Sequence, residues 1–325
     1  MVELKRNLEY FVEGKGKIED DQKVKEFDKV LEGFCSQLED SAMEKTESER
    51  QAIDFIISKM QDIARNCGVE PRAYNSRQVH FLSDEDFKKI LKEDNLPDET
   101  AAFAGWDGIG INEKLKQELG DLNFWLFLVH EFFHIFGKNK HHINEQEKKW
   151  KKIYRGGVRF EHGKPEALKQ ERFIGLNEAI TQALTNLFYS RVIRKSDFFK
   201  PLVEEFDEKD SVDGKWKFPE SCASFWPLVH LFEDLCQKIK NESGEKYEYI
   251  TEVMDEFFKI YFSGDIKEMK PLLDLVGEGC FGDLAEIGSG YNLPSLEKIK
   301  RFREKYQLKE DGELNRKIDQ LSSKK

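Results

Sequence analysis

The chain has 325 residues, of which 39% are hydrophobic and 35% charged, and its formal net charge is −11. The 26 Phe, 9 Tyr and 5 Trp supply enough apolar surface for a large core, so the high charge does not indicate disorder. Nucleic-acid-binding proteins need a basic surface, so this acidic balance argues against nucleic acid as a partner, and equally against an anionic membrane surface.

No segment of the sequence predicts a membrane span or secretion. The longest apolar run, 124–136, is shorter than the about 20 residues that a span needs and contains three ionisable side chains. The first residues contain no apolar run typical of a signal sequence. The five cysteines are scattered without a Cys-x-x-Cys pair, which is typical of reduced, buried thiols. We therefore expect a cytoplasmic protein.

The first part of the chain, residues 1–75, is predicted to be helical. Apolar residues recur at helical spacing over 24–38 and over 53–63, and Gly68 marks the predicted end of the second helix. Two amphipathic helices in a row predict a helical hairpin. We interpret this hairpin as packing material, with a propeptide-like or regulatory role as the alternative.

A mixed segment of strands and helix follows. Residues 78–82 are predicted to form a strand, and Ser83 is predicted to cap a helix in which Asp86 holds the capping-box position. Small residues and glycines alternate with β-formers over 102–112. This pattern predicts two strands joined by a tight turn at 106–108.

The rest of the chain is predicted to be mostly helical. The helix that follows is apolar almost all round, which predicts a buried central helix with Asp121 as its N-cap and Gly137 at its end. The Lys- and Glu-rich stretch 138–152 is predicted to be a solvated helix face. Further helices are predicted over 177–194, 225–239, 247–262 and 296–306. Together these elements predict an α+β fold that is predominantly helical.

The chemistry of the chain is concentrated in the apolar helix, at His130-Glu131-Phe132-Phe133-His134. Two histidines four residues apart lie on one helix face, so both can bind one metal ion, and Glu131 can take a proton from a water on that ion. This is the His-Glu-x-x-His pattern of zinc metalloproteases. The alternative, two histidines buried in a core helix, is costly because buried ionisable groups need partners.

A catalytic zinc ion usually has three protein ligands and a water, so a third ligand is needed. The metzincin pattern is one way to supply it, and Gly137 agrees with that pattern. However, Lys140 stands where metzincins have their third histidine, and His141 comes one residue late. We expect His141 and His142 to be solvent-facing loop residues instead.

Glu178 is the second candidate for the third ligand. We expect it in the first turn of a helix, where a glutamate also suits the helix dipole without any metal. Glu178 shares a polar helix face with Thr181, Gln182 and Thr185. That face is predicted to point into the site.

With His130, Glu131, His134 and the pair Asn177-Glu178, the sequence resembles the gluzincin metallopeptidases over about residues 78–190. It is most similar to compact, minigluzincin-like members with a reduced sheet. The resemblance implies a zincin-like catalytic domain with a small sheet lobe, a helical lobe and one Zn²⁺ between them. It also implies that His130, His134 and Glu178 are the metal ligands and that Glu131 is the catalytic base.

The resemblance also has a departure. Some gluzincins carry an aspartate four residues after the glutamate ligand, where it orients a zinc histidine, and here that position is Gln182. We expect Gln182, Thr181 or a backbone carbonyl to take over this support.

The function implied by the resemblance is peptide-bond hydrolysis, with a peptide or protein substrate as the partner. An extended substrate would pair with the strand over 103–111. The group that stabilises the oxyanion stays open between Tyr154, His162 and His230, although His230 lies in an apolar helix and is more typical of a core histidine.

The resemblance divides the chain into an N-terminal helical region (1–75), a zincin-like catalytic core (76–200) and a helical C-terminal subdomain (201–325). Two alternatives to a general peptidase remain: an effector-like protease with one narrow target, and a non-catalytic binding or scaffold protein that keeps a zincin fold. Glu131 argues against the scaffold, because a purely structural metal site has no use for a base.

Overall fold

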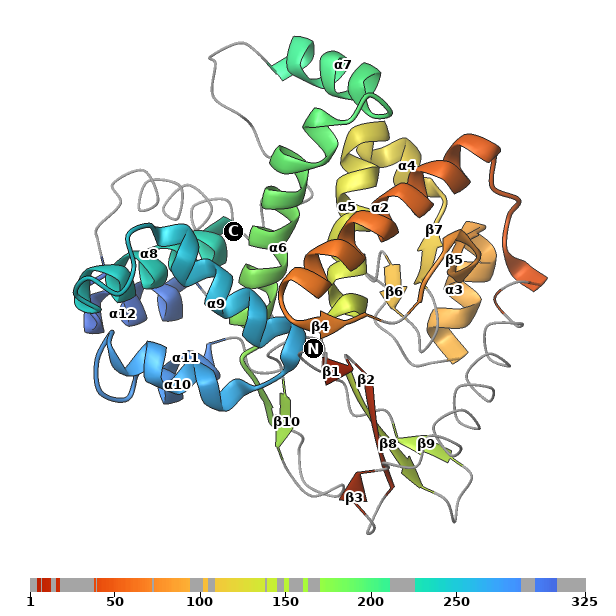
Figure 1. Ribbon diagram of the computed structural model, residues 1–325. Helices are drawn as coiled ribbons and strands as arrows, with labels where there is room; N and C mark the ends of the chain where they lie inside the picture. Colours follow the sequence, from red (N-terminus) through yellow and green to blue (C-terminus); the bar gives the residue numbers. More distant parts are fainter. Residues whose placement is uncertain are drawn as a thin grey trace.

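The computed structural model describes residues 5–6, 8–12, 16–17, 38, 40–71, 73–93, 102–104, 109–137, 139–144, 149–151, 160–162, 170–210, 226–287 and 296–308. Helices predominate among them, and small sheets make the fold α+β, as the sequence predicts (Figure 1). Residues 24–37 of the helix predicted over 24–38, the predicted turn at 106–108 and Tyr154 lie outside the described residues. No helix in the described part of the chain combines the length and the apolar character that crossing a bilayer requires.

The described helices are distributed along the chain from residue 47 to residue 305. They are α2 Glu47–Asn66, α3 Asp84–Glu93, α4 Lys114–Leu119, α5 Asp121–Phe136, α6 Ile174–Arg191, α7 Lys200–Asp210, α8 Trp226–Glu242, α9 Ile250–Ser263, α10 Ile266–Asp274, α11 Cys280–Glu286 and α12 Leu296–Lys305.

The described strands form four small sheets. One sheet has the order β5-β7-β6, with β5 parallel and β6 antiparallel to β7. The others have the orders β3-β2-β8-β9, β1-β4 and β10-β11. The bounds are β1 Lys5–Arg6, β2 Leu8–Val12, β3 Gly16–Lys17, β4 Val69–Glu70, β5 Val79–Leu82, β6 Ala102–Ala104, β7 Ile109–Asn112, β8 Asn139–Asn144, β9 Lys149–Lys151, β10 Phe160–His162 and β11 Gln170–Arg172.

Local signals in the sequence explain where several elements begin and end. The predicted cap of α3 by Ser83 is confirmed, because the Asp86 N–H donates to the Ser83 hydroxyl; that hydroxyl in turn donates to the Asp86 carboxylate. Helix α2 ends before Gly68, as predicted, and Gly68 has a φ of 79°, which glycine adopts most easily. Gly120, with a φ of 74°, is the N-cap of α5, so Asp121 is the first helical residue and not the predicted cap.

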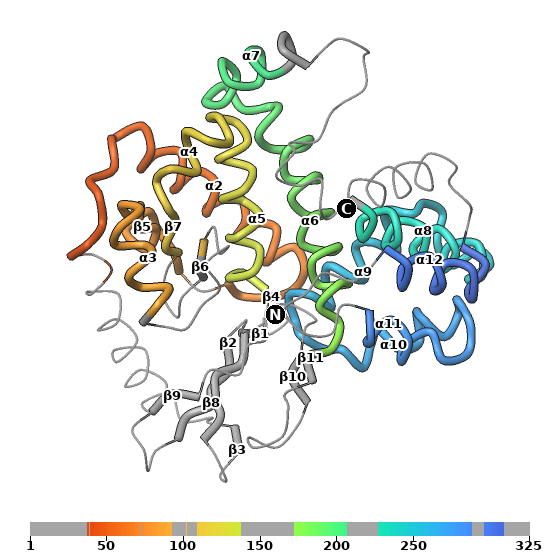
Figure 2. Tube along the Cα trace, turned by 180° about the vertical axis from the view of Figure 1, so that it is seen from behind, coloured from red at the N-terminus to blue at the C-terminus, as the bar shows by residue number. Residues whose placement is uncertain are grey.

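Helix α5 is the central helix of the fold. Most of its residues are buried, and it contacts α2, α6 and strand β6 (Figure 1). Both views place the sheet of β5 and β7 on one side of α5 and α6, and α8, α9 and α12 on the other side (Figures 1 and 2). The apolar character of α5 all round, read from the sequence, therefore corresponds to burial of most of its surface, while the face that carries Glu131 and His134 is only partly buried.

The C-terminal helices hold the beginning of α6. The N–H of Phe173 donates to the carbonyl of Ala285, and the N–H of Gly175 donates to the carbonyl of Ile287. Phe173 itself has a φ of 60°, a left-handed conformation that is uncommon for a bulky residue. These distant contacts start α6 at Ile174, so the prediction of a start near Asn177 is wrong by about one turn.

The stretch after α5 is also different from the prediction. Residues 138–152 include the strands β8 and β9 and not a helix face, and His141 and His142 belong to β8 and not to a loop. Strand β8 pairs in parallel with β2, more than 100 residues earlier in the chain. Because the partner strand is this far away in the sequence, the residues around β8 carry no local pattern that indicates the pairing.

Gly175 offers a test of this packing. A Cβ added at Gly175 would lie 3.0 Å from the Ile287 carbonyl oxygen and 3.2 Å from its side chain. We expect Gly175→Ala to lower the free energy of unfolding by about 1–3 kcal/mol, because the backbone of Ile287 must move. Chemical denaturation of the variant and the wild type measures this difference.

The matched control for this prediction is Gly282→Ala in α11, where a Cβ meets nothing within 4 Å. The stability of this control should stay the same or rise by up to about 1 kcal/mol. Equal stabilities of the two variants would contradict the close packing of α6 against Ile287.

Candidate metal centre

Three side chains predicted as ligands meet between α5 and α6. His130 and His134 lie one turn apart on α5, and their Nε2 atoms are 3.2 Å apart. The Oε2 atom of Glu178, from α6, lies 3.4 Å from each of these nitrogens. Within the described residues, this is the group of histidine and carboxylate side chains found close enough together to hold one metal ion.

The spacing of the three donor atoms fits a tetrahedral metal ion. With ligand bonds of 2.0–2.1 Å, as zinc makes to histidine and carboxylate, two ligand atoms of a tetrahedron lie about 3.3–3.4 Å apart. The observed separations of 3.2, 3.4 and 3.4 Å make a nearly equilateral triangle of this size. Two imidazoles and one carboxylate are also a donor set that zinc accepts, with one tetrahedral position left for a water or a substrate.

The sequence predicted Glu178 in the first turn of its helix, but it lies in the second turn of α6, because α6 begins earlier than predicted. Its side chain is 15% exposed, and burial alone would raise the pKa of its carboxyl. The neighbouring imidazoles of His134 and His130 outweigh burial and hold that pKa well below its usual range. Glu178 is therefore a carboxylate that faces two imidazoles, as a metal ligand would.

Glu131 lies next to the triangle and has the opposite electrostatic character. It is half-buried, and loss of hydration raises the pKa of its carboxyl. The imidazoles of His134 and His130 oppose this rise, and Glu178 adds to it by repulsion. A carboxylate with a raised pKa is a stronger base, so Glu131 is suited to accept a proton.

Gln182 supports His130 from behind. The Nδ1 atom of His130 lies 3.0 Å from the Oε1 atom of Gln182. An amide oxygen only accepts, so Nδ1 carries the hydrogen and donates it, which in the neutral ring leaves a lone pair on Nε2. This confirms one of the supports expected from the sequence, and it gives His130 the tautomer that a metal ligand needs. Asn177 approaches the other ligand, with its Nδ2 3.5 Å from His134 Nδ1.

Tyr261 connects the two helices that carry the ligands. Its hydroxyl, from α9, donates to the carbonyl of Phe133 at 2.8 Å and lies 3.0 Å from the hydroxyl of Thr181. Thr181 itself donates to the carbonyl of Asn177. Sequence reasoning missed this residue. The sequence pattern that could have indicated its role is a tyrosine on the apolar face of a helix, because a buried phenol needs a hydrogen-bond partner.

The other histidines considered from the sequence lie elsewhere. His230 is on α8 with its Nδ1 3.3 Å from a carboxylate oxygen of Glu233, and its side chain is 26% exposed, so it is not a core histidine. His162 belongs to β10. The part of the chain that the structure describes therefore does not identify the oxyanion-stabilising group.

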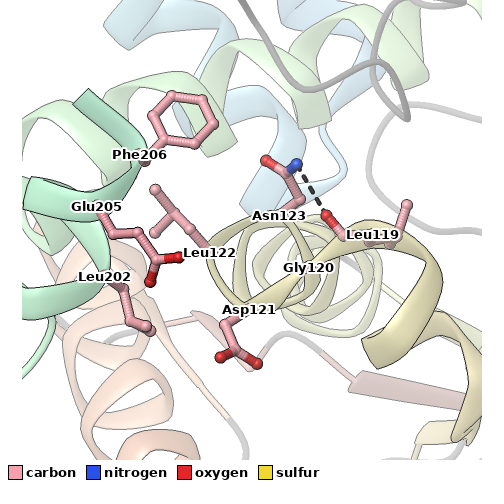
Figure 3. A pocket seen from close by; sticks show the side chains of 8 residues that line it. All are labelled: Leu119, Gly120, Asp121, Leu122, Asn123, Leu202, Glu205 and Phe206. Carbon is pink, nitrogen blue, oxygen red and sulfur yellow. Dashed lines mark hydrogen bonds between the residues drawn. The ribbon is translucent and has the colours of Figure 1, made fainter. Parts of the chain in front are cut away.

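A separate pocket of about 500 Å³ lies at the beginning of α5, at the opposite end from His134 (Figure 3). Apolar side chains of α5 and α7 line it together with the carboxylates of Asp121 and Glu205 (Figure 3). The only dashed hydrogen bond in this view runs from Asn123 to the carbonyl of Leu119. Because this pocket contains none of the three ligands, it is distinct from the candidate metal centre.

Comparisons with protein-family models, with curated proteins and with solved structures found no match to this chain.

The Tyr261 hydroxyl gives a testable prediction. Tyr261→Phe removes the hydrogen bond to the Phe133 carbonyl and leaves the Thr181 hydroxyl without this buried neighbour, so we expect the free energy of unfolding to fall by about 1–2 kcal/mol. Denaturant unfolding measures the loss. Tyr249→Phe is the control, since Tyr249 is 58% exposed and its hydroxyl loss should change stability by less than about 0.5 kcal/mol. A Tyr261→Phe variant as stable as this control would contradict the bridging role.

Proposed function

We propose that the protein is a zinc-dependent metallopeptidase of gluzincin type, with a zincin-like arrangement of a small sheet and a helical part around the metal. One observation carries the proposal: two imidazole nitrogens and a carboxylate oxygen form a triangle of the size that tetrahedral zinc needs. The neighbouring Glu131 adds a base to this metal centre, and a structural site would have no use for it.

His130, His134 and Glu178 would hold the ion. Zinc bound there supplies a Lewis acid and lowers the pKa of a bound water towards about 7. Glu131 takes the proton from the attacking water and delivers it to the leaving amine, with the raised pKa of its carboxyl helping the first transfer. Gln182 holds the His130 ring in the orientation that keeps Nε2 directed at the centre.

An extended peptide is the substrate that the surroundings of the site support best. Strand β6 is at the edge of its sheet among the described strands, and it contacts the active-site helix α5. An edge strand presents unpaired backbone groups, so a peptide in extended conformation can add to it by backbone hydrogen bonds. The sequence leaves open whether the protein cleaves many peptides or one narrow target. The cytoplasmic location also stays a prediction from the sequence.

Metal content tests the ligand set. We expect one zinc per chain in the wild-type protein after dialysis, and a loss of most of it in Glu178→Ala, because two imidazoles alone hold zinc weakly. Mass spectrometry of the dialysed proteins measures this. Glu233→Ala is the matched control, a glutamate that faces His230 instead, and it should keep its zinc. Unchanged zinc in Glu178→Ala would rule out Glu178 as the third ligand.

Activity tests the role of Glu131. We expect Glu131→Gln to keep its zinc, because Glu131 is not a ligand. We expect its kcat for peptide cleavage to fall by about 10²–10⁴-fold, because the amide cannot accept the proton. A peptide library cleaved by the wild type supplies the substrate. Zinc bound by a wild type that cleaves none of these peptides or candidate proteins would favour the scaffold.

A further inference from the structure

Behind the metal centre, three side chains form a chain of hydrogen bonds that the proposed reaction does not itself require. His130 donates from Nδ1 to the Oε1 of Gln182 at 3.0 Å. Gln182 then donates from Nε2 to the Oδ1 of Asn186 at 2.9 Å. Gln182 is 1% exposed, so its amide has no water to replace these partners. Asn186, one turn further along α6, is therefore the second partner of the same amide.

The donor-to-acceptor direction of these hydrogen bonds determines whether His130 can bind a metal ion. An amide can turn by 180° and exchange its oxygen with its nitrogen. If the Gln182 amide were turned, its Nε2 would donate to Nδ1 of His130, and the ring hydrogen would move to Nε2. That hydrogen would then point at Glu178 and His134, whose atoms lie 3.4 and 3.2 Å away, and would occupy the side where a metal ion binds.

Asn186 selects between the two directions through the atom that it presents to Gln182. Its Oδ1 accepts and so requires the N–H side of the Gln182 amide to face it. Asn186 also lines a cavity of about 210 Å³, together with the carboxylates of Glu233 and Asp255 and the guanidinium of Arg191.

We propose that Asn186 is a positioning residue for the metal centre: by accepting from Gln182, it fixes the Gln182 oxygen on His130 and keeps the His130 Nε2 lone pair available to zinc. This inference rests on the proposed function, because it concerns the same metal ligand. Asn186 touches neither the three donor atoms nor Glu131 through any hydrogen bond of the described residues, and it acts through Gln182 alone.

Zinc affinity of the full chain, measured by competition with a chelator, tests the proposal without an activity assay. Asn186→Leu removes the acceptor, so the Gln182 amide can turn, and we expect the zinc dissociation constant to rise about 3- to 10-fold. Asn186→Asp keeps an acceptor at the same place and should stay within about 2-fold of the wild type. Thermal unfolding of each variant with its metal removed reports whether it folds.

A double variant separates positioning from a general structural effect. In Gln182→Glu, the carboxylate accepts from His130 in either orientation, so Asn186 has no direction left to select. Adding Asn186→Leu to Gln182→Glu should therefore change the dissociation constant by less than about 2-fold. An equal effect of Asn186→Leu in both backgrounds would overturn the proposal.

A spectroscopic measurement gives an independent readout. In the metal-free wild type, ¹⁵N NMR of the His130 ring should show the tautomer with its hydrogen on Nδ1, and in Asn186→Leu a larger share with the hydrogen on Nε2. If the wild type binds zinc but Asn186→Leu changes neither the zinc dissociation constant nor the His130 tautomer, this inference alone is overturned. A wild type that binds no zinc would overturn it together with the proposed function.

Discussion

Three donor atoms from two packed helices lie within 3.4 Å of one another, and keeping them this close is the main requirement on the elements around them. Lone pairs of two imidazoles and a carboxylate that point at a common centre repel each other unless positive charge lies between them. Burial alone would raise the pKa of the Glu178 carboxyl, but the neighbouring imidazoles of His134 and His130 hold it well below its usual range. A bound cation would satisfy the same requirement more completely.

Holding the cluster together is the task of residues well outside the His-Glu-x-x-His segment. Tyr261 of α9 joins α5 to α6 through the Phe133 carbonyl and the Thr181 hydroxyl. The carbonyl groups of Ala285 and Ile287 accept hydrogen bonds from the N–H groups of Phe173 and Gly175 at the beginning of α6. The C-terminal helices therefore take part in building the site, and a boundary near residue 200 does not separate the site from the elements that position it.

The sequence predicted which side chains come together between α5 and α6 better than it predicted the elements that support them. The two histidines, Glu131 and Glu178 were identified because their spacing and polarity stand out in apolar or amphipathic helices, which are local signals. The start of α6 at Ile174, the strand β8 and the contact of Tyr261 each depend on a partner distant in the chain. No single-sequence pattern encodes such partners, so these features became visible only with the fold.

Zinc K-edge X-ray absorption of the zinc-loaded wild type tests the proposed ligand set, because it reports the atoms around the metal. We expect four nitrogen and oxygen neighbours at about 2.0–2.1 Å, with outer scattering from two imidazole rings. Sulfur neighbours, or scattering from three or more imidazoles, would contradict a centre built from His130, His134 and Glu178.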